Sequence, residues 1–159
     1  MARSVEYPSA EFPGPPRITL QIPEDWEPLT VPGVQVAVAQ PRIEGRFRAN
    51  VVVTVQRFGP DYTLAAAREG LEQRKAALPG LEEIGTGEIE VAGITWIASE
   101  YGYTQPGRDT VVQASRYAVL DRGVATDVVE IVGSCGAQSA EDEIEMVRAV
   151  QDSATLQLD

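Results

Sequence analysis

The stretch Arg46-Phe-Arg-Ala-Asn-Val-Val-Val-Thr-Val-Gln-Arg-Phe-Gly59 is the longest in the chain with the composition of a β-strand. It lacks proline, has a glycine at either end and is rich in β-branched and aromatic residues. Its odd positions from Phe47 to Val55 are apolar, and its even positions from Arg48 to Gln56 are mostly polar. Because side chains alternate across a strand, one row can enter a core while the other meets water or a ligand. The pattern predicts the central strand of an antiparallel sheet.

Further strands are predicted on both sides of this stretch. Alternating apolar residues mark residues 17–22 and 34–39 before it, and residues 155–158 are compatible with a short edge strand. After it come four runs of about ten residues joined by short glycine-containing turns or loops, at 82–91, 94–103, 110–120 and 124–132. Such closely connected runs are typical of an antiparallel meander.

Two helices are predicted, and both are expected on the apolar side of the central strand. The first covers 61–78, with Thr63 as its N-cap and Lys75 outside its apolar stripe. That stripe consists of Leu64, Ala67, Leu71 and Leu78. The second helix begins at Ser139, with Asp142 as the acid of a capping box. Its inner side is expected to carry Ala140, Ile144, Val147, Val150 and Gln151.

The predicted fold class is α+β, with an antiparallel sheet of about six strands packed with two helices. A length of 159 residues suits one domain with a substantial core. Residues 1–16 hold four prolines and are expected to form an extended Pro-rich arm. Residues 17–159 are expected to form the single domain.

Composition excludes several classes of function. A net charge of −11 disfavours nucleic acid and anionic membranes as partners. The absence of histidine removes the usual catalytic triads and histidine metal sites, and a single cysteine, Cys135, precludes an internal disulfide. We therefore expect no cofactor, no metal and no enzymatic activity. No apolar run is long enough for a transmembrane segment.

Several short motifs resemble the LpqN-type proteins of actinobacteria, part of the Mog1/PsbP-like superfamily. The matching segments are residues 18–23 followed by Trp26, residues 47–50 leading into 51–55, residues 61–64 at the start of a helix, residues 93–96, and residues 133–135 before the last helix. The resemblance covers residues 17–156. It implies an antiparallel sheet flanked by helices, and a mostly non-catalytic family that includes envelope lipoproteins, a Ran-binding protein and a photosystem subunit.

The chain departs from the lipoprotein members of that family at its start. It shows neither a signal sequence nor a lipid-bearing cysteine there. As written, the sequence predicts a cytoplasmic location, and an envelope location only if a leader was removed.

Candidate binding residues come from the polar row of the central strand and from two tyrosines. Arg48, Asn50, Thr54 and Gln56 are expected on its outer face, as a hydrogen-bonding groove or simply as a solvated sheet face. By strand parity, Trp96 belongs to the core, whereas Tyr101 and Tyr103 lie on the opposite side, as surface candidates or as ordinary packing. Cys135 is expected to be an inert thiol.

Three functions are compatible with these residues. The first is a non-catalytic interaction module that contacts a protein partner through the polar sheet face or the acidic surface. The second is a protein that binds a small molecule or glycolipid in a cleft near Asn50, Tyr101 and Tyr103. The third is a carboxylate-dependent hydrolase, for which no pair of acids stands out.

Overall fold

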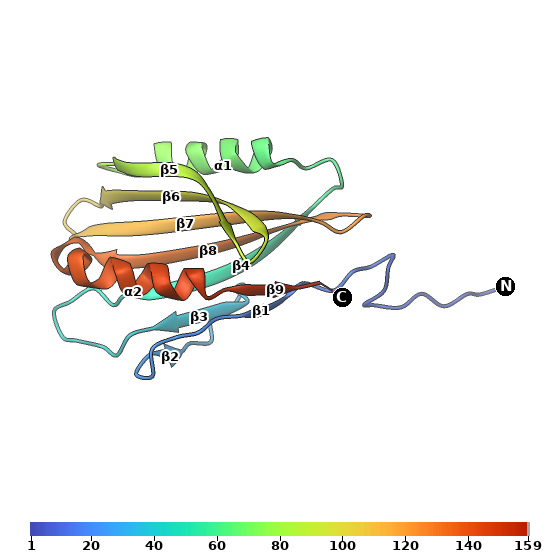
Figure 1. Cartoon of the computed structure of the whole chain (residues 1–159), viewed down its shortest axis with the longest axis horizontal. Helices are drawn as coiled ribbons and strands as arrows, with labels where there is room; N and C mark the ends of the chain where they lie inside the picture. Colours follow the sequence, from blue (N-terminus) through green and yellow to red (C-terminus); the bar gives the residue numbers. More distant parts are fainter. Residues whose placement is uncertain (159) are drawn as a thin grey trace.

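Seven strands form one antiparallel sheet, in the order β2-β3-β4-β8-β7-β6-β5, in the computed structural model, which describes residues 1–158 (Figure 1). The other two strands, β1 and β9, pair with each other. The strands are β1 (Arg17–Thr19), β2 (Glu27–Pro28), β3 (Val36–Ala39), β4 (Asn50–Phe58), β5 (Glu82–Val91), β6 (Ile94–Thr104), β7 (Thr110–Asp121), β8 (Thr126–Gly136) and β9 (Thr155–Gln157). The helices are α1 (Leu64–Ala76), a single 3₁₀ turn η1 (Ala137–Ser139) and α2 (Ala140–Asp152). The predicted α+β fold class is confirmed.

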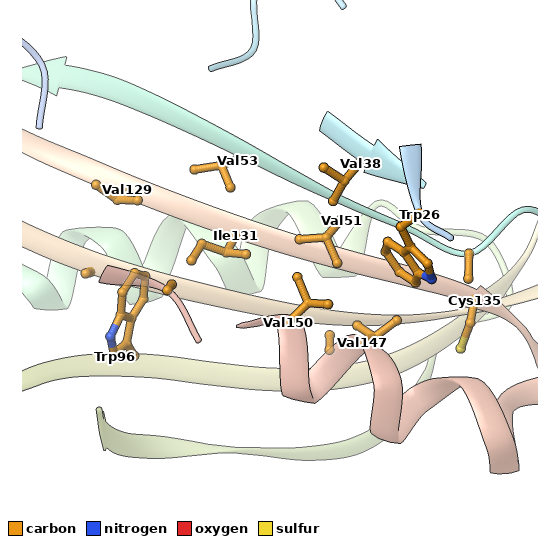
Figure 2. Close-up of a cluster of buried hydrophobic side chains, with 14 of the residues drawn as sticks. Trp26, Val38, Val51, Val53, Trp96, Val129, Ile131, Cys135, Val147 and Val150 are labelled. Atoms are coloured by element: carbon orange, nitrogen blue, oxygen red, sulfur yellow. The ribbon is translucent and has the colours of Figure 1, made fainter. Parts of the chain in front are cut away.

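The predicted central strand is β4, an interior strand between β3 and β8. Its odd residues Val51 and Val53 are fully buried, as the alternation predicted. They lie opposite Gly133 and Ile131 of β8, and this row packs beneath Val147 and Val150 of α2. Figure 2 shows these side chains between the strands and α2.

The two helices cover opposite faces of the sheet, which corrects the prediction that both lie on one side. Whereas α2 packs on the face that carries Val51, helix α1 packs through Ala67 and Leu71 on the other face. There the two residues meet Ile97, Tyr117 and Val128. The reason is that both alternating rows of side chains in β6, β7 and β8 include apolar residues, so both faces of the sheet carry side chains that must be covered.

The strand predicted from Arg46 begins only at Asn50, and Phe47 lies outside it with 36% of its surface exposed. Pro41 follows the end of β3, and proline cannot donate a hydrogen bond to a neighbouring strand. The segment before Ala49 therefore lacks a partner strand on that side and forms a loop. The expectation that Phe47 enters the core is wrong for this reason.

Helix boundaries also differ from the prediction in detail. Thr63 is the N-cap of α1 as predicted, and its hydroxyl accepts a hydrogen bond from the Ala66 N–H at 3.1 Å. Ser139 precedes α2 but makes no capping hydrogen bond with its side chain, because the preceding η1 turn already leads the chain into the helix. The predicted inner side of α2 is confirmed, with Val147 and Val150 at its centre.

A buried carboxylate fixes the end of the sheet near the β7–β8 turn. Asp127 is fully buried and accepts from Arg57 at 2.7 Å and from Arg122 at 2.8 Å. Burial alone would raise the pKa of Asp127, but the hydrogen bonds from these arginines hold that pKa below its usual value. Arg57 also donates to the Pro13 carbonyl at 2.6 Å, which attaches the end of the N-terminal segment to the sheet. Residues 1–16 form neither helix nor strand.

Close packing of α2 on the sheet depends on Gly133 of β8. A Cβ atom built at this position would lie 2.0 Å from Cγ1 of Val147, well inside van der Waals contact. The absence of a side chain at Gly133 thus sets how near the helix can lie.

We expect Gly133→Ala to lower the free energy of unfolding by about 1–3 kcal/mol, because the new methyl group forces α2 away from the sheet. Gly87→Ala in β5 is the matched control, since a Cβ there meets no atom within 4 Å, and its effect should stay within about 0.5 kcal/mol. Urea unfolding of the two variants measures both values, and equal effects would contradict this account of the packing.

Candidate functional site

Four strands bring polar side chains into one row across the face that α1 covers. Asn50 of β4 lies opposite Ser134 of β8, which lies opposite Gln113 of β7, and Gln113 lies opposite Tyr101 of β6. Two of the predicted site residues, Asn50 and Tyr101, therefore share one cross-strand row, as strand parity suggested. They stand at its two ends.

Hydrogen bonds within this row use most of its polar groups. The Tyr101 hydroxyl lies 2.8 Å from the Ser115 hydroxyl and donates to Gln113 at 3.1 Å, and the Gln113 amide donates to Ser134 at 3.1 Å. Tyr101 is only 5% exposed, so of its two expected roles, surface candidate or ordinary packing, the structure shows ordinary packing. Burial raises the pKa of its hydroxyl. The covering helix, which strand parity alone does not reveal, is the reason.

Lys75, the only lysine of the chain, lies buried next to this row. Its ammonium group donates to Glu83 at 2.6 Å, Ser99 at 3.0 Å and Glu72 at 3.2 Å, and it lies over the Tyr101 ring. Burial alone would lower the pKa of Lys75, but the hydrogen bonds to the two glutamates outweigh that effect and raise it. The lysine joins α1 to the sheet and is satisfied, so it acts as a structural cation.

Sequence reasoning placed Lys75 outside the buried stripe of the first helix, and this was wrong. The stripe runs through Ala67, Leu71 and Lys75, each four residues from the next. The helical spacing from Leu71 was a signal that could have identified it. Charge alone argued for the opposite placement, because buried lysines are rare.

Two other predicted residues, Thr54 and Gln56, line a small niche beside α1. Its volume is about 40 Å³, and its other walls include Tyr117, Arg74 and Glu130. Arg74 donates to the Tyr117 hydroxyl at 2.5 Å. Burial, together with the neighbouring carboxylate of Glu130, raises the pKa of Tyr117. The niche can hold a water molecule and is too small for an organic ligand.

The last two predicted residues lie away from the others. Arg48 donates to the Gln40 carbonyl at 2.6 Å and pairs with Glu27 at 3.1 Å. Tyr103 lines a pocket of about 470 Å³ at the end of the sheet where the β3–β4 and β6–β7 loops lie. The six predicted residues are thus divided among a buried row, a small niche and this end of the sheet, and they do not form one cleft.

The pocket at the end of the sheet has a volume within the range of small-molecule sites. Its lining residues are Gly45, Arg46, Phe47, Tyr103, Gln105, Gly107, Arg108, Asp109 and Val111. Sequence reasoning found only Tyr103 among them. Phe47 was assigned to the core, and the two arginines lie in loops whose proximity no local pattern encodes.

Cys135, the remaining candidate group, is not accessible to solvent. Cys135 is fully buried, and its burial raises the thiol pKa to about 11, which agrees with the expectation of an inert thiol. Within residues 1–158, no three or more Asp, Glu or Cys side chains are arranged to hold a metal ion. None of the helices described is long and apolar enough to cross a membrane.

The fold is identified by comparison with solved structures, because comparisons of sequence found no match. No protein-family model matches the sequence, and no curated protein matches it. LpqN of Mycobacterium tuberculosis, involved in cell envelope biogenesis, superposes with a TM-score of 0.76 at 18% identity, over 91% of this chain and 86% of LpqN. The cyanobacterial PsbP (CyanoP) of Synechocystis gives 0.60 at 14% identity, over 98% of both chains. The Ran-binding protein Mog1p of Saccharomyces cerevisiae gives 0.57 at 14% identity, over 87% of this chain and 89% of Mog1p.

The chain therefore has the Mog1/PsbP-like fold. LpqN shares this fold, as the resemblance found in the sequence predicted.

Replacing Lys75 with methionine tests its structural role. Lys75→Met keeps the volume of the side chain but removes its charge-assisted hydrogen bonds, so we expect a loss of about 1–3 kcal/mol in the free energy of unfolding at pH 7. The control is Arg68→Met on the same helix, whose ion pair with Glu88 is exposed and whose loss should change stability by about 0.5 kcal/mol or less.

The difference in stability between the wild type and Lys75→Met should depend on pH. The hydrogen bond from Lys75 lowers the pKa of Glu83, and a lowered carboxylate pKa stabilises the fold above the unfolded value of 4.5. The advantage of the wild type over Lys75→Met should therefore be complete near pH 7 and shrink as pH falls through the folded pKa of Glu83. Urea unfolding at pH 7 and pH 3 measures it, and an advantage that grew in acid would contradict the assignment.

Cys135 provides an independent probe of the fold. Its burial and raised pKa predict no reaction with Ellman's reagent at pH 8 in the native protein, and stoichiometric reaction in urea. Rapid labelling of the native protein would show that the β8–α2 packing opens readily.

Proposed function

We propose that this protein is a non-catalytic interaction module that binds an extended, basic segment of a partner protein along β5. The observation that supports it is an open, ten-residue acidic edge strand. An extended segment can add to such an edge through backbone hydrogen bonds, while its side chains provide specificity.

Strand β5 is the last strand on its side of the sheet and pairs only with β6. All of its residues from Glu82 to Glu88 are exposed. The opposite edge is β2, which has only two residues and includes Pro28. Proteins commonly protect sheet edges by such short, proline-containing strands, so the contrast leaves β5 as the edge available to a partner.

The charge of β5 favours a basic partner over a second copy of this chain. Glu82, Glu83, Glu88 and Glu90 all lie on this strand. Lys75 pairs with Glu83 and Arg68 with Glu88, whereas Glu82 and Glu90 form no ion pair with any residue from 1 to 158. Two β5 strands side by side would bring like charges together. A segment with lysine or arginine would instead pair with these acids.

An apolar contact point is present in the same strand. Ile84 lies at a bulge between Glu83 and Gly85, and 59% of its surface is exposed. Bulges locally redirect side chains and are frequent at functional edges. A partner residue packed on Ile84 would add apolar burial to the backbone pairing.

The polar face, the other candidate for a protein contact, is less suited to it. On this face, Tyr101 and Ser134 are already hydrogen-bonded to Gln113. Helix α1 also packs on the same face. The Ran-binding protein Mog1p has the same fold, which is consistent with an interaction module. The similarity at 14% identity concerns the fold alone.

The test uses a ten-residue peptide of alternating lysine and threonine as a probe of strand addition. We expect it to bind and to slow amide hydrogen exchange in β5, whereas an alternating glutamate and threonine peptide should not. The same basic peptide with N-methyl groups at alternate residues loses its backbone donors and should not protect β5.

Charge-reversal variants distinguish binding at β5 from general electrostatic attraction to the acidic protein. The double variant Glu82→Lys/Glu90→Lys should weaken binding of the basic peptide by about three- to tenfold. Glu6→Lys/Glu11→Lys changes the net charge equally in an exposed segment outside the sheet, and should have a much smaller effect. Equal losses in both variants, or protection outside β5, would overturn the proposal.

A further inference from the structure

Two neighbouring pockets open at the end of the sheet opposite the β7–β8 turn, and they share Gly45 and Arg46. The first is the 470 Å³ pocket already described, and the second, of about 600 Å³, is lined by the β3–β4 loop. Figure 1 shows this loop and the β6–β7 loop at the same end of the molecule. Both volumes lie within the range of small-molecule sites.

Arginines outnumber acids among the residues that line these two pockets, although the protein as a whole is acidic and two of the arginines pair with Glu143 and Glu27 outside the linings. The chain has 24 acidic and 13 basic residues, yet the two pockets together are lined by four arginines and only two acids. The arginines are Arg42, Arg46, Arg48 and Arg108, and the acids are Glu44 and Asp109. A guanidinium group donates up to five hydrogen bonds in a geometry that suits carboxylates and phosphates.

Two of these arginines keep donors available to a ligand. The Arg46 side chain makes one hydrogen bond, to Glu143 at 3.2 Å, and remains 48% exposed. Arg108 forms no ion pair with any residue that the structure describes, and its side chain lies at the surface. Both line the first pocket.

Glu143 of α2 restrains the position of Arg46. Glu143 lies in the first turn of α2, is 5% exposed and also accepts from the Gln40 amide at 3.4 Å. Its second carboxylate oxygen is buried without a hydrogen-bond partner among residues 1–158. The contact with this buried carboxylate restrains the guanidinium, which lowers the entropic cost of ordering it around a ligand.

Three residues of the first pocket supply apolar surface beside its polar lining. Phe47 leaves 36% of its surface exposed, and Tyr103 and Val111 are partly buried beside it. An aromatic ring left open to solvent next to two arginines suits a molecule with an apolar body and an anionic group.

We propose that this pocket binds a small amphiphilic anion, in which one carboxylate or phosphate group is attached to an apolar body. Arg46 and Arg108 hold the anionic group, and Phe47 and Tyr103 contact the apolar body. This site is separate from β5 and does not depend on the function proposed there. A neutral glycolipid would leave the arginine donors without charged partners, so the anion fits better.

Isothermal titration with three octyl compounds, each below its micellar concentration, tests the proposal. Octyl phosphate and octanoate carry the two anionic groups, and octyl glucoside is the neutral counterpart with the same chain. We expect at least one of the two anions to bind about tenfold or more tightly than the glucoside. The tighter of the two identifies a phosphate or a carboxylate as the natural anionic group.

Variants locate the binding. Arg108→Gln should weaken binding of the preferred anion by about tenfold, and it should leave the fold intact because Arg108 is an exposed loop residue. Arg17→Gln in β1, also exposed and without an ion pair among residues 1–158, is the matched control and should bind as the wild type does. Glu82→Lys/Glu90→Lys should not change octyl phosphate binding, which separates this site from β5. Equal affinity for the glucoside, or an unchanged affinity in Arg108→Gln, would overturn the proposal.

Discussion

The contact between Val147 and Gly133 governs how α2 lies on the sheet. Because β8 has no side chain at that point, the helix approaches closely enough for Val147 and Val150 to fill the space above Val51 and Val53. The same approach buries Glu143 in the first turn of α2, next to the β3–β4 loop. The packing of one helix thus determines where Arg46 is held, and the shape of the pocket at the end of the sheet follows from it.

The two faces of the sheet are covered by different kinds of contact. The α2 face is a continuous apolar core, whereas the α1 face combines a small apolar cluster with the ammonium group of Lys75 and a row of hydroxyl and amide groups. Polar contacts need defined geometry, so α1 has one favoured position on its face. That position leaves the outer edge of β5 free and places the polar row out of reach of a large ligand.

Strand positions and parity could be predicted from the sequence, because alternation is a local property of the chain. Val51, Val53 and Trp96 are buried as expected. The side on which each helix packs could not be predicted, because α1 leaves β4 and crosses to the far edge of the sheet before β5 begins. Lys75 was misplaced as a result, and the two alternatives for Tyr101, a surface position or ordinary packing, could not be distinguished. The pocket residues Phe47 and Arg108 come from two loops that meet only through the order of the strands.

Strands β1 and β9 join the two ends of the domain, with Arg17 opposite Gln157. Ile18 and Leu156, which also lie opposite each other, pack against the α2 core from this ribbon. Pairing of segments so distant in the sequence costs loop-closure entropy. On the ribosome, this flank of the core therefore stays uncovered until β9 has emerged to pair with β1.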